Sequence, residues 1–98
     1  MFLLQFLKFP IRFFRVHGES MRPTLKSGQL VIIWCHGKRK VGDVVVFKTE
    51  AQWMVKRIDH REGNRYFMKG DHWRESTDSD AFGAIALDQI MGKVLVAF

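Results

Sequence analysis

From residue 11 onward, apolar and polar residues alternate in short runs of the kind that form β-strands. These runs are rich in β-branched and aromatic residues, and glycine-containing turns separate them. Beyond residue 20, no stretch of helical period is longer than about ten residues. The strands expected from this pattern are Ile11–His17, Gln29–Cys35, Asp43–Lys48, Gln52–Asp59, Arg65–Lys69 and Lys93–Phe98.

The segments between these strands predict how the strands are connected. Glu62-Gly63-Asn64 has the composition of a hairpin turn, and short helical turns are expected at Ser20–Leu25 and Leu87–Ile90. The chain of 98 residues is long enough for one domain, which we expect over residues 11–98. The pattern therefore predicts a mostly β fold, either a small curled antiparallel sheet or a partly open barrel.

The first ten residues are expected to form a short segment of their own, which begins an amphipathic pattern over residues 1–16 that could contact a membrane surface. Gln5, Lys8, Arg12 and Arg15 follow one another at helical spacing, so they share one face while apolar residues occupy the rest. Pro10 interrupts the pattern, and the segment is shorter than the ~20 apolar residues of a membrane span. We expect it to touch a membrane surface or to pack on the domain of a cytoplasmic protein, with a membrane-bound protein as the alternative.

Net charge and cysteine content narrow the classes of partner and chemistry. The net charge of +6 and the pI of about 9.9 favour anionic partners, namely membrane phosphates, nucleic acid or an acidic protein. The single Cys35 cannot form an intramolecular disulfide, and we expect it to pack within a strand. The four histidines have no metal-like spacing, so neither a metal nor another cofactor is expected.

Lys56 is a candidate for a buried lysine. Side chains alternate between the two faces of a strand, so Lys56 shares its face with Met54 and Ile58. Burial disfavours the ammonium form and would lower the pKa of the lysine from its usual ~10.4. A neutral amine can remove a proton from a hydroxyl group. The alternative is a lysine at a strand edge that extends its charged end into solvent.

Ser20 is a candidate nucleophile at the exit of a strand. It follows Gly18, which permits an unusual backbone conformation, and opens a turn that contains Pro23. A nucleophilic serine needs a base within hydrogen-bonding reach and donors for the oxyanion, one of which could be its own N–H. The alternative is a serine that caps the N-terminus of a helical turn.

Five segments of the chain resemble, in order, the characteristic segments of type I signal peptidases. The resemblance extends from residue 14 to residue 94, and the order of the segments makes chance agreement improbable. The segments are Gly18-Glu19-Ser20-Met21-Arg22-Pro23-Thr24-Leu25, Gly42-Asp43-Val44-Val45-Val46-Phe47, Val55-Lys56-Arg57-Ile58, the run from Gly70-Asp71 through Ser76-Thr77-Asp78-Ser79 to Phe82-Gly83, and Ile90-Met91-Gly92-Lys93-Val94.

The resemblance implies a role for each matching residue. Ser20 would attack the scissile carbonyl, and Lys56 would take its proton and later protonate the leaving amine. Ser76 would hydrogen-bond the lysine and orient it. Some members have an additional oxyanion serine where this chain has Gly18, so the oxyanion hole would consist of backbone N–H groups, chiefly that of Ser20. Met21 is the best candidate for a contact with the substrate.

The chain departs from the family pattern in the segment after Gly70. His72 replaces the usual asparagine, and the usual Asp-Ser-Arg run ends here in an aspartate. The missing arginine removes an expected ion pair with Asp78, for which Arg57 and Arg74 are candidate replacements. We expect Asp71, Asp78 and Arg57 to support the geometry of the site.

Three features resemble the maturation proteases of nickel-type superoxide dismutase, which remove an N-terminal extension. They are the lead-in Arg12-Phe13-Phe14-Arg15-Val16, the run Glu75-Ser76-Thr77-Asp78-Ser79 and a chain that ends soon after Gly92-Lys93-Val94. We therefore expect a serine endopeptidase that removes an N-terminal signal or propeptide from a precursor protein and cuts after small residues. The substrate would bind as an extended strand beside Ile11–His17 and Gln52–Lys56. A general signal peptidase acting at the membrane is the alternative.

Two further functions remain open from the sequence. A non-catalytic basic module would bind nucleic acid or a membrane through Arg12, Arg15 and residues 38–40 with neighbouring aromatic residues, although nucleic acid is the less favoured partner. A self-cleaving repressor-type peptidase would share the serine–lysine chemistry. It needs a cleavable linker before the domain, and only about 17 residues precede Gly18, so we rank it lower.

Overall fold

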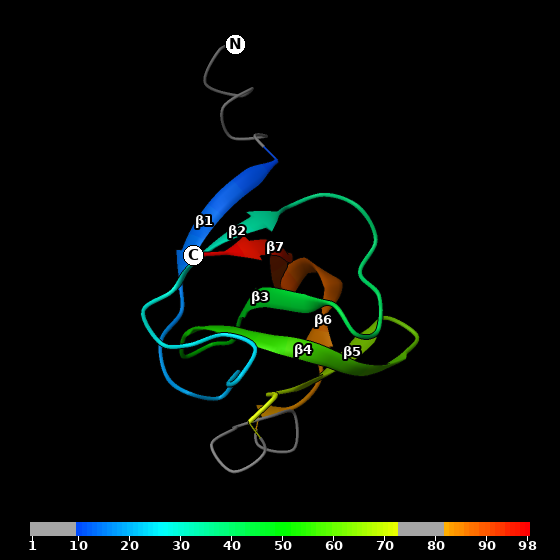
Figure 1. Cartoon of the computed structure of the whole chain (residues 1–98). Helices are drawn as coiled ribbons and strands as arrows, with labels where there is room; N and C mark the ends of the chain where they lie inside the picture. The colour runs from blue at the N-terminus through cyan, green and yellow to red at the C-terminus, as the bar shows by residue number, and fades with distance from the viewer. Residues whose placement is uncertain (1–9, 73–81) are drawn as a thin grey trace.

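The computed structural model describes residues 10–72 and 82–98. These residues form a single seven-stranded sheet with one short 3₁₀ turn, η1 (Figure 1). The elements are β1 (Ile11–Arg15), β2 (Leu30–Trp34), β3 (Val44–Lys48), β4 (Trp53–Glu62), β5 (Arg65–Lys69), β6 (Ile85–Ala86), η1 (Leu87–Gln89) and β7 (Ile90–Ala97).

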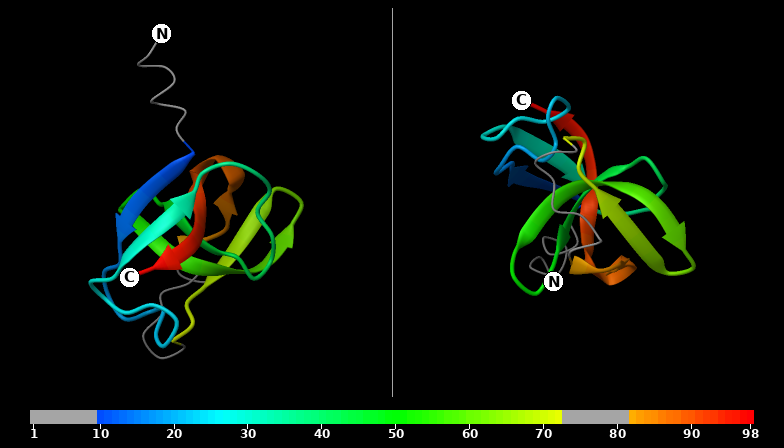
Figure 2. Two further views of the ribbon diagram at one scale, coloured as in Figure 1. Left: turned by 45° about the horizontal axis from the view of Figure 1, so that its top comes forward. Right: turned by 90° about the horizontal axis from the view of Figure 1, so that it is seen from below.

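The sheet has the order β1-β2-β7-β3-β4-β5-β6, and every neighbouring pair is antiparallel. It is strongly curled but not closed into a barrel (Figure 2). Register shifts between β2 and β7, β3 and β7, and β4 and β5 contribute to this curl. The mostly β fold with a curled antiparallel sheet is therefore confirmed.

The last strand, β7, joins the two halves of the sheet because it lies between β2 and β3. Gly92 is buried within it, and a Cβ atom at this position would lie 2.8 Å from the carbonyl oxygen of Trp34. Backbones can approach this closely only where no side chain intervenes. Glycine is therefore required at the junction of the two halves.

Most of the expected strands overlap those of the structure. Arg65–Lys69 has the expected bounds, and the turn at Gly63 joins β4 to β5 as a hairpin. The structure adds β6, which the sequence did not predict, and β7 begins at Ile90 rather than Lys93. The expected helical turn at Ser20–Leu25 is a series of hydrogen-bonded turns.

Two groups of buried side chains cover the opposite faces of β3. Its central residues Val45 and Val46 are both fully buried, and they belong to different groups. Alternation therefore sends one face of the strand into each group. The first core cluster is Val16, Met21, Leu25, Val31, Ile33, Val46 and Val55. The second core cluster is Val45, Phe47, Ile58, Tyr66, Met68, Ile85 and Ile90.

The curl of the sheet explains this arrangement, because each end of the sheet folds over a different face of its centre. Cys35, which follows β2, is half-buried and packs against the first core cluster, as expected for a packed cysteine. Within residues 10–72 and 82–98, no helix is long and apolar enough to cross a membrane.

Candidate active site

Lys56 is buried in the middle of the sheet. Only 1% of its surface is exposed. Lys56 lies on β4, and its register partner on β3 is Val45 of the second core cluster. Its neighbours on the same face of β4 are the half-buried Met54 and the buried Ile58. The burial expected from the alternation of β4 is therefore confirmed. Removal from water disfavours an ammonium and favours the neutral amine.

Ser20 lies in the turn that follows β1, and its side chain is half-buried. Met21 and Leu25 anchor this turn because their side chains are buried in the first core cluster, at 1% and 4% exposure. The N–H of Leu25 donates to the carbonyl of Met21 at 2.8 Å. Gly18 has a φ of +85°, in the left-handed region that favours glycine, and lets the chain leave β1 for this turn.

A segment of three residues connects the surroundings of Lys56 with Ser20. On β5, Lys69 is the register partner of Arg57, the residue that follows Lys56 on β4. Three residues after Lys69, the N–H of His72 donates to the carbonyl of Ser20 at 2.8 Å. Residues 70–72 therefore lead from the end of β5, the neighbour of the lysine strand β4, to the turn of the serine.

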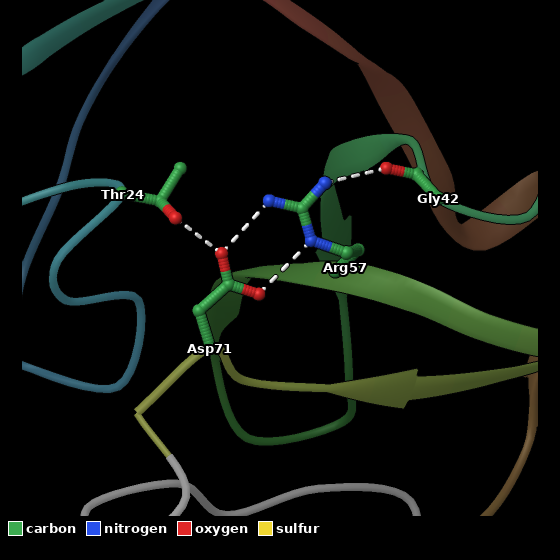
Figure 3. A network of polar contacts seen from close by, with 4 residues as sticks. All are labelled: Thr24, Gly42, Arg57 and Asp71. Carbon is green, nitrogen blue, oxygen red and sulfur yellow. Dashed lines mark hydrogen bonds and ion pairs between the residues drawn. The ribbon is translucent and has the colours of Figure 1, made fainter.

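Asp71, in the middle of this segment, accepts hydrogen bonds from both regions (Figure 3). Arg57 donates to it twice, from Nε to Oδ1 at 2.9 Å and from Nη2 to Oδ2 at 2.8 Å. The hydroxyl of Thr24, from the turn of Ser20, also donates to Oδ2. Nη1 of Arg57 reaches the carbonyl of Gly42 at 2.7 Å. The guanidinium and the carboxylate thus lock three segments of the chain together.

The ion pair also sets the charges of its members. The hydrogen bonds from Arg57 lower the pKa of the Asp71 carboxyl, partial burial opposes this effect, and the Thr24 hydroxyl adds to it. In turn, the Asp71 carboxylate raises the pKa of Arg57 against the effect of burial. Asp71 is therefore an anion at neutral pH and holds its partners by charge-assisted hydrogen bonds.

The structure locates most of the predicted site residues. Ser76 and Asp78 lie outside the described residues. The guanidinium of Arg57, a candidate partner for Asp78, is bound to Asp71 and to the carbonyl of Gly42. Met21 is buried in the first core cluster, and its contact with substrate stays a prediction.

Sequence reasoning missed the part that Thr24 and Gly42 take in the network of Asp71. Both belong to segments that carry the family resemblance, which was the only available signal. The described residues contain no group of three or more His, Cys, Asp or Glu side chains that could hold a metal ion.

Comparison with known proteins defines the class of the molecule as a serine peptidase. The model of the family described as Peptidase S24-like matches residues 7–95. The chain therefore belongs to the Peptidase S24-like family. No relative was found among curated proteins. The resemblance to type I signal peptidases is finer than this assignment and is carried by the sequence motifs alone.

Proposed function

We propose that the protein is an endopeptidase in which Ser20 is the nucleophile and Lys56 is the general base. The observation that carries this proposal is the burial of Lys56 on β4, the strand whose next residue, Arg57, is tied through Asp71 to the turn of Ser20. Burying a lysine amine is costly for a small domain, and such strongly desolvated ionisable groups occur preferentially at functional sites. Membership of a serine peptidase family supports the role of a base for this lysine.

The chemistry requires only groups of this chain, the substrate and water. As Ser20 Oγ bonds to the scissile carbonyl carbon, its proton passes to Lys56 Nζ, and the carbonyl oxygen becomes an oxyanion near the N–H of Ser20. When the C–N bond breaks, Lys56 returns the proton to the leaving amine. Lys56 then deprotonates a water molecule that attacks the ester carbonyl, and it returns this proton to Ser20 Oγ as the ester bond breaks. Ser76 would keep the amine aimed at the hydroxyl group.

Two strand edges are suited to bind an extended substrate. In the described part of the chain, Trp53–Lys56 of β4 pairs with β3 on one side, whereas β5 pairs with β4 only from Arg57 onward. Ile58 exchanges hydrogen bonds with the β3 side through both its N–H and its C=O. By the two-residue period, the backbone groups of Val55 and Trp53 point to the uncovered side.

The outer edge of β1 offers a second row of backbone groups. Pro10 accepts a hydrogen bond from Cys35, and Val16 donates to Gln29, so the even-numbered residues of this strand bond toward β2. The backbone groups of Ile11, Phe13 and Arg15 then face away from the sheet. Both edges run toward the catalytic residues, and a precursor segment between them would be bound by backbone hydrogen bonds, whatever its sequence.

The proposed substrate is a precursor protein with an N-terminal extension that ends in small residues. Maturation of nickel-type superoxide dismutase is the preferred case, because the sequence motifs resemble those of its maturation proteases. A general signal peptidase acting on secreted precursors is the alternative. The two differ in which precursor is cut, so the experiment can separate them.

The test is N-terminal sequencing of a nickel-type superoxide dismutase precursor and of a secretory precursor after incubation with the enzyme. We expect one new N-terminus, directly after a small residue, and none with the Ser20→Ala protein. Cleavage by Ser20→Ala would refute the assigned nucleophile. The enzyme incubated alone should keep its mass, whereas loss of a fragment would identify a self-cleaving peptidase.

The same protein is proposed to work at the surface of an anionic membrane. The outer face of β1, β2 and β7 is apolar, and register places Phe13, Ile32 and Val96 in one row across it. Phe13 is 63% exposed and Val96 44% exposed. The charged residues at register positions of this face are the cations Arg15 and Lys93. An exposed apolar face with basic residues and an amphipathic segment before β1 fits lipid headgroups.

Vesicle co-sedimentation tests this contact. We expect binding to vesicles with anionic lipid, weak binding to neutral vesicles, and several-fold weaker binding by Phe13→Ser. Val41→Ser, which changes an equally exposed valine in the loop between β2 and β3, is the matched control. Equal binding by the two variants, or self-association in solution that explains the apolar face, would contradict the proposal.

A further inference from the structure

A surface hollow of about 630 Å³ lies beside the start of β1, away from Ser20. It is bounded by the β3–β4 hairpin, by η1 and by the beginnings of β1 and β7. No step of the proposed mechanism uses it. Its lining includes Arg12, Cys35, Lys48, Trp53, Asp88 and Met91.

The hollow lies in line with the two strand edges proposed to bind the substrate. On β1, Val16 and Phe14 pack in or against the first core cluster, and Arg12 is the next residue on that face. On β4, Val55 is in the same cluster and Trp53 is the next residue on its face. Arg12 and Trp53 therefore extend both rows of inward side chains into the hollow.

The two-residue period of a strand then fixes which substrate residue reaches the hollow. A substrate laid along β1 turns alternate side chains inward, at steps of ~7 Å. For a substrate that runs parallel to β1 with its scissile bond at Ser20, the residue before the bond would face Val16, the third residue before the bond would face Phe14, and the fifth would face Arg12 and Trp53. The second and fourth residues point outward.

The lining of the hollow favours an apolar side chain. The charged residues of the lining carry no net charge, because the two cations Arg12 and Lys48 are matched in number by the two carboxylates Glu50 and Asp88. Trp53, 44% exposed, presents a ring that the Lys48 amine approaches to 5.6 Å from its centre.

The uncharged polar groups at the rim already have partners within the chain. The amide of Gln89 accepts from the N–H of Ala86 and donates to the carbonyl of Lys48. The hydroxyl of Thr49 donates to the carbonyl of Gln52. Few groups remain for a polar ligand, whereas the rings and thioether of Trp53 and Met91 provide apolar surface.

We propose that this hollow is a specificity site for a large apolar side chain at the fifth residue before the scissile bond. The proposal rests on the function proposed above and on a substrate that runs parallel to β1. It adds a requirement that a small residue before the bond does not supply, and so restricts the set of precursors that the enzyme cuts.

The test uses peptides with alanine at the first and third positions before the bond and glycine, alanine or phenylalanine at the fifth. Their affinity for Ser20→Ala is measured by fluorescence anisotropy, and their kcat/KM with the active enzyme. We expect phenylalanine at the fifth position to improve both by ~10-fold over glycine. The same change at the fourth position should have little effect.

Variants locate the preference. Trp53→Ala should reduce the ratio between phenylalanine and glycine peptides to near one, while the control Val41→Ala keeps it. Cleavage without a preference at the fifth position would overturn the specificity site alone. Selective binding to Ser20→Ala without cleavage by the active enzyme would overturn the peptidase mechanism alone. A protein that neither binds nor cuts the peptides overturns both.

Discussion

Two neighbouring basic residues on β4, Lys56 and Arg57, occupy opposite faces of the strand in different surroundings. Lys56 is 1% exposed and lies between apolar residues of the second core cluster. The side chain of Arg57 is 37% exposed, and its charge is matched by Asp71 at 2.8 Å. One step along the strand therefore separates a guanidinium partly exposed to solvent and held by an ion pair from an amine buried beside apolar side chains.

The chemistry of the two side chains fits their positions. A guanidinium stays protonated and has a planar fork of donors, so it suits a permanent bidentate pair with a carboxylate. A lysine can lose its proton when it is buried, so it suits proton transfer. The strand thus combines a fixed structural contact with a titratable group, and the first holds the segments around the second in place.

Replacing Lys56 should give the largest effect on activity and little loss of stability. Lys56→Met keeps most of the side-chain volume but removes the base, so we expect cleavage to fall by ~1,000-fold or more. Because an apolar group replaces a buried amine, Tm should stay the same or rise. Lys69→Met on β5, an exposed lysine, is the control and should keep its activity. A Lys56→Met protein with substantial activity would refute the general base.

Replacing Asp71, the anion of the ion pair, should mainly reduce stability and should reduce cleavage much less than the loss of Lys56 does. Asp71→Asn leaves the half-buried Arg57 without its carboxylate, and we expect a loss of about 1–2 kcal/mol in urea unfolding, limited by the exposure of the pair. Cleavage should fall by only ~10-fold, since the catalytic groups remain but are less well positioned. The exposed Asp59→Asn serves as the control. Equal effects of the two variants would show that the pair does not stabilise the fold.

Acid should remove the contribution of this pair selectively. An unfolded aspartate titrates near ~3.9, whereas the pKa of Asp71 is lower in the folded protein. The stabilisation is therefore complete above ~pH 5 and is lost as the pH falls through the folded value. The difference in Tm between the wild type and Asp71→Asn should be constant from pH 7 to ~5 and then shrink. A difference that shrinks already above pH 5, or does not shrink in acid, would contradict the lowered pKa.

The alternation of apolar and polar residues predicted the features that depend only on residues close together in the sequence. The strand at Arg65–Lys69 and the burial of Lys56 follow from alternation, because each residue's face is set by the residues two positions away. The two residues of β6 are too few to show any period. Glycine is unfavourable within strands, yet Gly92 lies inside β7 because the backbone of Trp34 approaches it closely there.

Contacts between distant segments could not be derived in this way. The pairing of Arg57 with Asp71 requires the register of β4 and β5 and the path of residues 70–72. The expected proximity of Ser20 and Lys56 came from the family resemblance. Hydrophobic periodicity assigns residues to faces, but it does not say which turn folds over which strand.

The smallest effect is expected at Thr24, which joins the ion pair to the turn of Ser20. Thr24→Val keeps the shape of the side chain and removes the hydroxyl that donates to Asp71. Because the group is exposed, we expect a loss of only ~0.5–1 kcal/mol in urea unfolding, and Thr24→Ser should restore it. A double-mutant cycle with Asp71→Ala isolates the contact, since the valine change should cost less once the carboxylate is absent. Strictly additive losses would show that Thr24 and Asp71 stabilise the fold independently. The ion pair would then stabilise the surroundings of β4, which carries Lys56, without stabilising the turn of Ser20.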